Sequence, residues 1–318
     1  MGKLRRAVVE RDLVEGRRVV VTGANSGLGR ATSELLLGLG ARVVMTARRA
    51  DAGEAEAAVL RHRYPSASVE CVRLDLSDRA SVAAAAQQIL AGPVDVLVNN
   101  AGGMADGTLE AMFVGNVLGH FQLTRTLLPA LLEARGKLVV VSSLGHAGAV
   151  LPRPGESLAA LLASGRGSSI GKYGLTKLFG IWHAMGLHRR HHAEGLRTYA
   201  LHPGGIATEG FDKTQGLPFY ERWGATLYKH LFAEKDVSLG AQAALHCIGN
   251  RDADRESGRY YDNCAPASPR HCDDPARMDE LFALCDERLS WAARNLRLQH
   301  PVAGDVRRFP DRTSGGAP

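Results

Sequence analysis

Short runs of β-branched and aliphatic residues recur along the chain, and segments with helical spacing separate them. The first run shows no polar alternation, which is typical of a strand buried on both faces of a parallel sheet. The runs lie at residues 18–22, 41–46, 69–74, 94–98, 137–141, 197–201 and 258–261. Helices are predicted between and after them at residues 30–40, 51–63, 79–90, 110–134, around 173, 239–247 and 278–296. This alternation predicts right-handed crossovers and a single doubly wound parallel α/β sheet with helices on both faces.

No internal repeat or interdomain linker interrupts the alternation, so we expect one domain over residues 17–299. A polar arm (1–16) precedes it, and a tail rich in Gly, Pro and charge (300–318) follows it and is predicted to be disordered. Pro129 is expected to bend or stop the 110–134 helix, because proline removes a main-chain donor and clashes with the preceding turn.

Two segments inside the domain are candidates for shaping a substrate site. Residues 144–170 combine two prolines and a Gly/Ser cluster with an apolar Leu158–Leu162 turn, and this insertion is expected to roof the site or to form a surface lobe. Residues 205–235 hold a group of aromatic side chains that includes Phe211, Phe219, Tyr220, Trp223 and Tyr228. These either line a bulky apolar substrate pocket or pack against the insertion as core.

Composition limits the function classes. The net charge is +6, but the basic residues are scattered, and no basic stripe interleaved with aromatic residues indicates a nucleic-acid partner. The five cysteines are odd in number and form no C-x-x-C pair, which favours reduced thiols and a cytoplasmic location. Neither a signal peptide nor an apolar run of the ~18 residues that a membrane span needs is visible.

A row of histidines raises the question of a metal site. His183, His188, His191 and His192 follow the helix around residue 173. The adjacent Arg189 and Arg190 would repel a cation, so the row is interpreted as a solvated helix end and no metal site is predicted.

A glycine-rich turn directly follows the first strand. Thr22 to Gly29 has the spacing G-x-x-x-G-x-G and opens the first helix. In this context glycines let the backbone approach a pyrophosphate, and the helix N-terminus supplies free N–H groups. The alternative is a tight turn that needs glycine only for backbone geometry. Ligands of such Rossmann-type sheets lie beyond the carboxyl ends of the strands, where residues 99–102, 142–143 and 203–204 also fall.

Tyr173 and Lys177 are the candidate proton carriers. At i and i+4 on a helix they share one face. A phenol titrates near ~10, and a fixed ammonium nearby favours the phenolate and lowers this pKa. Such a tyrosine could pass a proton to or from a substrate oxygen.

With these features in their order, the chain resembles the short-chain dehydrogenase/reductase family over roughly residues 17–295. Six motifs carry the resemblance: Thr22-Gly23-x-x-x-Gly27-x-Gly29, Asn99-Asn100-Ala101-Gly102, Gly115-Asn116, Ser143, Tyr173-x-x-x-Lys177 and Pro203-Gly204-x-x-x-Thr208. The segments Asn116-Val-Leu-Gly-His-Phe and Gly258-Arg-Tyr-Tyr-Asp-Asn-Cys264 are most similar to the branch of retinol dehydrogenases and WW-domain oxidoreductases.

The resemblance implies roles for individual residues. Tyr173 would be the proton donor or acceptor, Lys177 would lower its pKa and hold the nicotinamide ribose, and Ser143, rather than Ser142, would bind the reacting carbonyl. Asn116 would position a water that leads to the lysine, its alternative being an ordinary polar residue on a helix. Asp75 would accept from the adenine amino group, with a helix cap shared with Ser77 as its rival. The full set of implied cofactor-binding residues is Gly23, Asn25, Ser26, Gly27, Leu28, Gly29, Arg48, Arg49, Asp75, Leu76, Asn100, Ala101, Gly102, Tyr173, Lys177, Pro203, Gly204 and Thr208.

The end of the second strand indicates the choice of cofactor. An acidic residue there would bind a ribose 2′-hydroxyl, but Ala47 stands at that position and Arg48 and Arg49 follow. The sequence therefore favours NADP(H) over NAD(H), and Asp51 is interpreted as the cap of its own helix.

Two functions from different classes remain. One is an NADP(H)-dependent oxidoreductase that transfers a hydride between the nicotinamide and a carbonyl or alcohol substrate, a bulky and apolar small molecule similar to a retinoid, steroid or lipid. The other is a catalytically silent NADP(H)-binding regulatory or scaffold protein, which would need only the nucleotide half of the site. A homo-oligomer is compatible with both.

Overall fold

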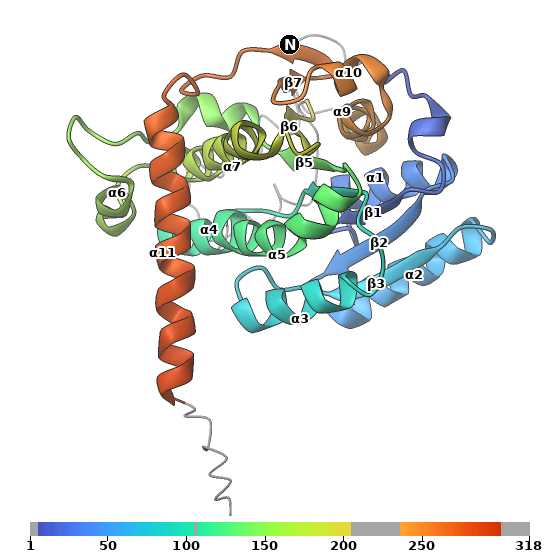
Figure 1. The fold of residues 1–318 in the computed structure, drawn as a ribbon, viewed down its shortest axis with the longest axis horizontal. Helices are drawn as coiled ribbons and strands as arrows, with labels where there is room; N and C mark the ends of the chain where they lie inside the picture. Colours follow the sequence, from blue (N-terminus) through green and yellow to red (C-terminus); the bar gives the residue numbers. More distant parts are fainter. Residues whose placement is uncertain (1–5, 105–106, 205–235, 300–318) are drawn as a thin grey trace, which may run out of the picture.

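The computed structural model describes residues 6–104, 107–204 and 236–299, with side chains to residue 290. Its centre is one eight-stranded sheet with the order β3-β2-β1-β4-β5-β6-β7-β8 (Figure 1). The predicted aromatic segment at 205–235, Thr208 within it, and the tail at 300–318 lie outside the described residues.

The strands follow the predicted runs closely. Their bounds are β1 Arg18–Val21, β2 Arg42–Ala47, β3 Val69–Arg73, β4 Val96–Asn99, β5 Lys137–Val141, β6 Arg197–His202, β7 Tyr260–Asp262 and β8 Ala265–Ala267. All neighbouring pairs from β3 to β7 are parallel, and only β8 pairs antiparallel, with β7. Because β1 lies between β2 and β4, the strand order reverses there, which is where ligands bind in doubly wound sheets. The predicted α/β fold class is confirmed.

Alternate residues of each strand face two separate cores. Val20, Leu97 and Leu138 belong to one, and Val19, Val98 and Val139 belong to the other. Buried side chains of α3 (Arg79–Ile89), α4 (Leu109–Phe113), α5 (Gly119–Glu133), α7 (Ser169–His191) and α11 (Pro275–Gln299) complete the first core. Those of α1 (Gly27–Gly38), α2 (Ala50–Arg63), α9 (Val237–Gly249) and α10 (Arg251–Arg255) complete the second. Helices therefore cover both faces of the sheet, as expected for buried parallel strands.

The long helix predicted at 110–134 is interrupted, but not at Pro129. Pro129 lies inside α5, which continues to Glu133. The proline is exposed, so water can satisfy the carbonyl group that loses its donor. The interruption falls instead at η2 (Val114–Leu118), a π-helical turn between α4 and α5. A Cβ on Gly119, at its end, would lie 2.2 Å from the carbonyl oxygen of Leu76, so this backbone approach requires glycine.

The insertion at 144–170 divides into two parts. The first is a 3-10 turn, η3 (Leu144–Gly148), which packs against α7. The second is a short helix, α6 (Leu158–Ser164), whose three leucines at 158, 161 and 162 are buried against α4 and α11. The predicted apolar turn is thus a helix in a lobe on α11.

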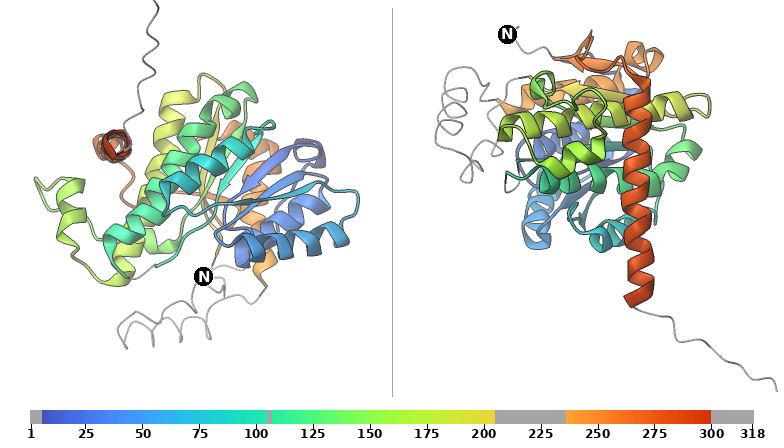
Figure 2. Two further views of the ribbon diagram at one scale, coloured as in Figure 1. Left: turned by 90° about the horizontal axis from the view of Figure 1, so that it is seen from below. Right: turned by 90° about the vertical axis from the view of Figure 1, so that its left-hand side faces the viewer.

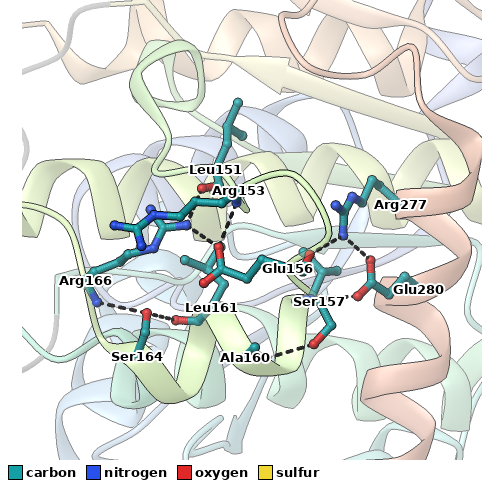
Figure 3. A network of polar contacts seen from close by, with 11 residues as sticks. Leu151, Arg153, Glu156, Ser157, Ala160, Leu161, Ser164, Arg166, Arg277 and Glu280 are labelled. Atoms are coloured by element: carbon teal, nitrogen blue, oxygen red, sulfur yellow. Dashed lines mark hydrogen bonds and ion pairs between the residues drawn. The ribbon is translucent and has the colours of Figure 1, made fainter.

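A polar network fixes this lobe (Figure 3). The Leu158 amide donates to the Glu280 carboxylate of α11 over 2.6 Å, and the Arg277 guanidinium donates both to Glu280 (2.6 Å) and to the Glu156 carbonyl (3.0 Å). Arg166 closes the other side through the Leu151 carbonyl and the Glu156 carboxylate. Figures 1 and 2 show α11 running along this side of the molecule, beside α5 and α7.

The histidine row after Tyr173 is not a solvated helix end throughout. The His183 ring is buried between the rings of Phe121 and Phe282, with centroids 5.1 and 5.8 Å away. Arg189 and Arg190 both pair with Asp279 of α11. Within the described ranges, no group of three His, Cys, Asp or Glu side chains could hold a metal ion. Over the same ranges, no helix combines the length and apolarity that crossing a membrane requires.

Four histidines of the described chain are buried: His120, His146, His183 and His202. Burial disfavours the charged imidazolium and lowers the pKa of each, to about 4 for His120 and His202 and to about 3 for His183. The unfolded chain takes up these protons near pH 6.5, whereas the folded chain takes them up only at lower pH.

We therefore expect the free energy of unfolding to be fully maintained above pH 6.5 and to fall as the pH drops toward 4. A histidine lowered to about 4 accounts for up to about 3 kcal/mol of this loss, since one pKa unit is about 1.36 kcal/mol. Urea unfolding between pH 7 and pH 4 measures the slope. His183→Phe should flatten it, and an unchanged slope in that variant would show that His183 is not buried neutral.

Candidate active site

The glycine-rich turn links β1 to α1. Gly23 and Gly27 have φ values of 64° and 53°, a conformation that favours glycine. A Cβ on Gly29 would lie 2.3 Å from the Gly23 carbonyl oxygen and 2.5 Å from Asn100 Nδ2. The turn therefore has steric reasons for its glycines. Ser26 is the N-cap of α1 but makes no side-chain capping bond, so the first-turn N–H groups are not occupied by it, and Asn25 and Leu28 flank the turn half-buried. This cradle fits a phosphate group.

Thr22 joins this turn to the segment that follows β4. Its Oγ1 accepts hydrogen bonds from the main-chain N–H groups of Asn100 (2.9 Å) and Ala101 (3.0 Å). Asn100 Nδ2 in turn donates to the Thr22 carbonyl over 2.8 Å. Asn99 points elsewhere, and its Nδ2 donates to Thr124 Oγ1 of α5 over 3.0 Å. The two turns at the switch point thus share hydrogen bonds.

The two arginines after β2 differ in their surroundings. Arg48 is exposed and forms no ion pair or hydrogen bond with another described residue. Arg49 is the N-cap of α2 and pairs with Asp51 over 2.6 Å. Asp51 therefore lies in the first turn of α2. The prediction that Asp51 caps this helix is wrong, because the N-cap residue is Arg49. The Arg49 hydrogen bond lowers the pKa of Asp51 to about 2.

Asp75 and Leu76 follow β3. The Asp75 carboxylate accepts from the Ser77 amide over 3.0 Å, but the N-cap of α3 is Asp78, which accepts from Ala80. The rival role of Asp75 as a helix cap is therefore not supported. Leu76 is half-buried beside Gly119 of α5.

Two hydrogen bonds, one from the side chain of Lys177 and one to its main chain, hold this residue at the end of β5. Its Nζ donates to the Val141 carbonyl over 2.9 Å, and its own carbonyl accepts from Ser142 Oγ over 2.9 Å. Ser142 is thereby occupied in holding α7 against β5. The Lys177 side chain is buried, and its Nζ lies 5.6 Å from the centroid of the Tyr173 ring. Burial raises the pKa of Tyr173 to about 12 and lowers the pKa of Lys177 to about 8. The predicted lowering of the Tyr173 pKa is therefore wrong for this structure, because burial of the phenol outweighs the nearby ammonium.

Ser143 lies beside Tyr173. A Cβ placed on Gly145 would lie 3.5 Å from Ser143 Oγ and 3.8 Å from Tyr173 Cδ1, so the two side chains border the same point. Ser143 Oγ accepts from the Gly145 amide over 3.1 Å, a bond that does not use its hydroxyl hydrogen, and no residue that the structure describes accepts that hydrogen. A Cβ on Gly174 would lie 2.3 Å from the Gly145 carbonyl oxygen, so η3 can pack against α7 only because this residue is glycine.

Asn116 lies in the π-helical turn and connects three segments. Its Nδ2 donates to the Gly103 carbonyl (2.8 Å) and to Thr176 Oγ1 (3.1 Å), and its Oδ1 accepts from the Gly103 amide (3.0 Å). A Cβ on Gly102 would lie 3.2 Å from Asn116 Oδ1 and 3.4 Å from Lys177 Nζ. Asn116, Lys177 and the residues after β4 therefore meet at one point, and the alternative of an ordinary polar helix residue does not describe Asn116.

The residues at the end of β6 and two buried histidines also lie near the site. Pro203 and Gly204 follow the strand, half-buried, and Gly204 has a φ of 87°. His202 Nδ1 accepts from the Leu144 amide over 3.2 Å, and His146 Nδ1 bonds the Ser143 carbonyl over 2.7 Å. These two histidines, and His120, were not identified from the sequence, because nothing in their spacing shows which strand end they contact.

Comparison with known proteins agrees with this geometry. A family model described as short chain dehydrogenase matches residues 17–153. Retinol dehydrogenase 12 of Mus musculus is 34% identical over 79% of this chain and 79% of its own length. Dehydrogenase/reductase SDR family member 13 of Homo sapiens is 35% identical over 79% of this chain and 67% of its own length.

Solved structures extend the comparison. A Beutenbergia cavernae protein described as an NAD(P)-dependent gluconate 5-dehydrogenase, with NADP bound at low occupancy, aligns with a TM-score of 0.63 at 25% identity. The alignment covers 79% of this chain and 96% of that one. On its sheet order, its site geometry and these relatives, the chain belongs to the short-chain dehydrogenase/reductase family, on the branch with proteins named retinol dehydrogenase.

Proposed function

We propose that this enzyme uses NADP(H) to interconvert a bulky, apolar alcohol and its carbonyl compound. The observation that carries the proposal is the meeting of Tyr173, Lys177, Ser143 and Asn116 at the carboxyl ends of β4 and β5. The same edge holds the glycine-rich turn, so a nucleotide and a substrate oxygen would be bound side by side.

The cofactor would be held by residues from four strand ends. The N–H groups at the start of α1, between Gly23 and Gly29, would bind the pyrophosphate, and Asp75 with Leu76 would face the adenine. Residues 100–102 would line the adenosine ribose, Lys177 would hold the nicotinamide ribose, and Pro203, Gly204 and Thr208 would border the nicotinamide. When bound, the nicotinamide supplies or accepts the hydride.

The protein groups then handle the substrate oxygen. The free hydroxyl hydrogen of Ser143 donates to it, a fixed donor aimed at an atom that gains charge during reduction. Tyr173 delivers the proton in reduction and removes it in oxidation, and Lys177 stabilises the phenolate between these steps. Asn116 is held by Gly103 and Thr176, which fixes the helix turn beside Lys177.

Arg48 supports the preference for NADP(H). It is exposed at the end of β2 with no partner among the described residues, whereas Arg49 is already paired with Asp51. An unpaired guanidinium can grip a 2′-phosphate without first losing an ion pair.

Two exposed apolar side chains support an apolar substrate. Leu144, beside Ser143, is 41% exposed, and Ile170, one helical turn before Tyr173, is 45% exposed. Large hydrophobic side chains left open next to a catalytic pair are expected to bind apolar ligand surface. Relatives named retinol dehydrogenase fit this class of substrate.

We expect purified enzyme to oxidise NADPH with retinoid, steroid or long-chain aldehydes and ketones, and to be much less active with short polar carbonyls such as sugars. The catalytic efficiency, kcat/KM, should rise with the apolar area of the substrate, at about 25 cal/mol for each Å² that the site buries. A panel of matched carbonyls, followed at 340 nm, measures it. Equal efficiency with polar and apolar substrates would contradict the proposed substrate class.

Tyr173→Phe should abolish turnover, because it removes the proton carrier while it keeps the ring. Proton transfer by a positioned side chain is typically worth ~10²–10⁴-fold in rate. The affinity for NADPH should stay nearly unchanged, and this serves as the control for folding. Activity above about a tenth of the wild-type rate would reject Tyr173 as the acid–base group.

Arg48→Ala should weaken NADPH binding about ten- to hundredfold and leave NADH binding little altered. The reason is that hydrogen bonds to charged groups contribute roughly 1.5–3 kcal/mol. Fluorescence titration of both cofactors measures the two affinities. Arg48→Ala/Arg49→Ala should show the full effect if Arg49 gives up Asp51 to share the phosphate. Arg42→Ala, at the opposite end of the same strand, is the matched control. Equal affinity of the wild type for both cofactors would overturn the NADP(H) assignment.

A further inference from the structure

His120 lies between the two halves of the site. It is 5% exposed, in the first turn of α5 directly after the π-helical turn. Its Nδ1 is 3.0 Å from the main-chain carbonyl oxygen of Asn116, and its Nε2 is 2.9 Å from Thr22 Oγ1. One imidazole ring thus spans from the turn that carries Asn116 to the residue that opens the glycine-rich turn.

The partners of His120 fix its tautomer. A carbonyl oxygen can only accept, so Nδ1 carries the hydrogen and donates to Asn116. In the neutral ring Nε2 is then an acceptor, and the Thr22 hydroxyl donates to it. Thr22 Oγ1 also accepts from the amides of Asn100 and Ala101, so its one hydrogen and both lone pairs are used.

The surroundings keep the ring neutral. Burial lowers the pKa of His120 to about 4, and the nearby Lys177 ammonium acts in the same direction. A hydrogen on both ring nitrogens would place an N–H against the Thr22 hydroxyl and remove its acceptor. The Thr22 hydroxyl has another acceptor within reach, the Val98 carbonyl oxygen at 3.3 Å. Without His120 Nε2, the Thr22 hydroxyl can rotate to donate to the Val98 carbonyl oxygen. Its lone pairs would then point away from the amides of Asn100 and Ala101.

We propose that His120 is a positioning residue that fixes the nucleotide-binding turn relative to the π-helical turn that carries Asn116. This inference rests on the proposed function, because it concerns how the same site is held. Through Thr22 the ring orients the amides of Asn100 and Ala101, at the expected adenosine ribose. Through the Asn116 carbonyl it holds the π-helical turn whose side chain bonds Gly103 and Thr176. Two functions, cofactor affinity and turnover, therefore depend on the two nitrogens separately.

Two conservative substitutions separate the nitrogens. A glutamine amide can take the place of Nε2 and accept from Thr22 but does not reach the Asn116 carbonyl from there. An asparagine amide can take the place of Nδ1 and donate to Asn116 but does not reach Thr22. We expect His120→Gln to keep the Kd for NADPH within about twofold and to lower kcat about fivefold or more, the effect of one lost hydrogen bond. His120→Asn should do the reverse, and His120→Phe should lose both.

Titration of NADPH by fluorescence gives Kd without turnover, and steady-state rates with the best apolar carbonyl give kcat. His183→Phe is the matched control, because it removes another buried imidazole that packs on α5, against Phe121, and it should leave both quantities unchanged. In a double-mutant cycle, the losses of NADPH affinity in Thr22→Val and His120→Phe should not add. The double variant should bind NADPH with a Kd no higher than that of the single variant that binds it more weakly.

The proposal is overturned if His120→Phe matches the wild type in Kd and kcat, or if the Thr22 and His120 losses of affinity add. It is also overturned if His120→Gln and His120→Asn show the same pattern. If His120→Phe does not fold, the comparison of His120→Gln with His120→Asn still tests the proposal. Failure of the proposed function shows in the wild type, as NADPH binding without turnover of any carbonyl, and the Kd series still decides the role of His120.

Discussion

A buried ammonium at residue 177 fixes the geometry on which the rest of the site depends. The end of β5 holds this residue twice, through Ser142 Oγ on its carbonyl and through the Val141 carbonyl on its Nζ. Burial alone raises the Tyr173 pKa and lowers the Lys177 pKa, so each group would favour its neutral form. The Lys177 Nζ lies 5.6 Å from the centroid of the Tyr173 ring, where a positive charge favours the phenolate over the phenol. Burial outweighs this attraction, because the Tyr173 pKa stays above its ordinary value.

The strand pattern was enough to predict the sheet, because the central strands β1, β4 and β5 are buried along their whole length and are therefore mainly apolar. What the pattern could not show depends on distant partners. The helix at Leu158–Ser164 is held by Glu280, 122 residues away, so its short apolar run read as a turn. The π-helical turn at Val114–Leu118 is packed where Gly119 meets Leu76 of another segment, whereas Pro129, the visible breaker, lies on an exposed face. Strand β8 follows a turn in which Asn263 and Cys264 have positive φ, and a cysteine gives no sequence signal for that.

Predicting which residues gather at the site was easier than predicting how they are held. Parallel strands bring their carboxyl ends to one edge, so Thr22, Asn100, Ser143 and Pro203 had to lie there together. Hydrogen bonds between them follow no such rule. His120 contacts Thr22 across 98 residues, whereas His183, another buried histidine, packs against the rings of Phe121 and Phe282. Arg48 and Arg49 are equivalent in sequence, yet one is paired with Asp51 and the other is free of described partners.

The way the two halves share atoms bears on whether this chain could bind a nucleotide and yet lack catalysis. A scaffold protein would need only the turns after β1, β2 and β4, and the remaining polar residues could then be lost without effect. Here the turn after β4 is itself shaped by the catalytic half: Gly103 is held at both its N–H and its carbonyl by Asn116, and Gly102 faces Asn116 and Lys177. Removing the Asn116 side chain would release Gly103, and removing the Lys177 side chain would open space beside Gly102. Retention of both groups is therefore explained by binding as well as by chemistry, whereas the free hydroxyl hydrogen of Ser143 and the Tyr173 phenol beside Lys177 are needed only for chemistry.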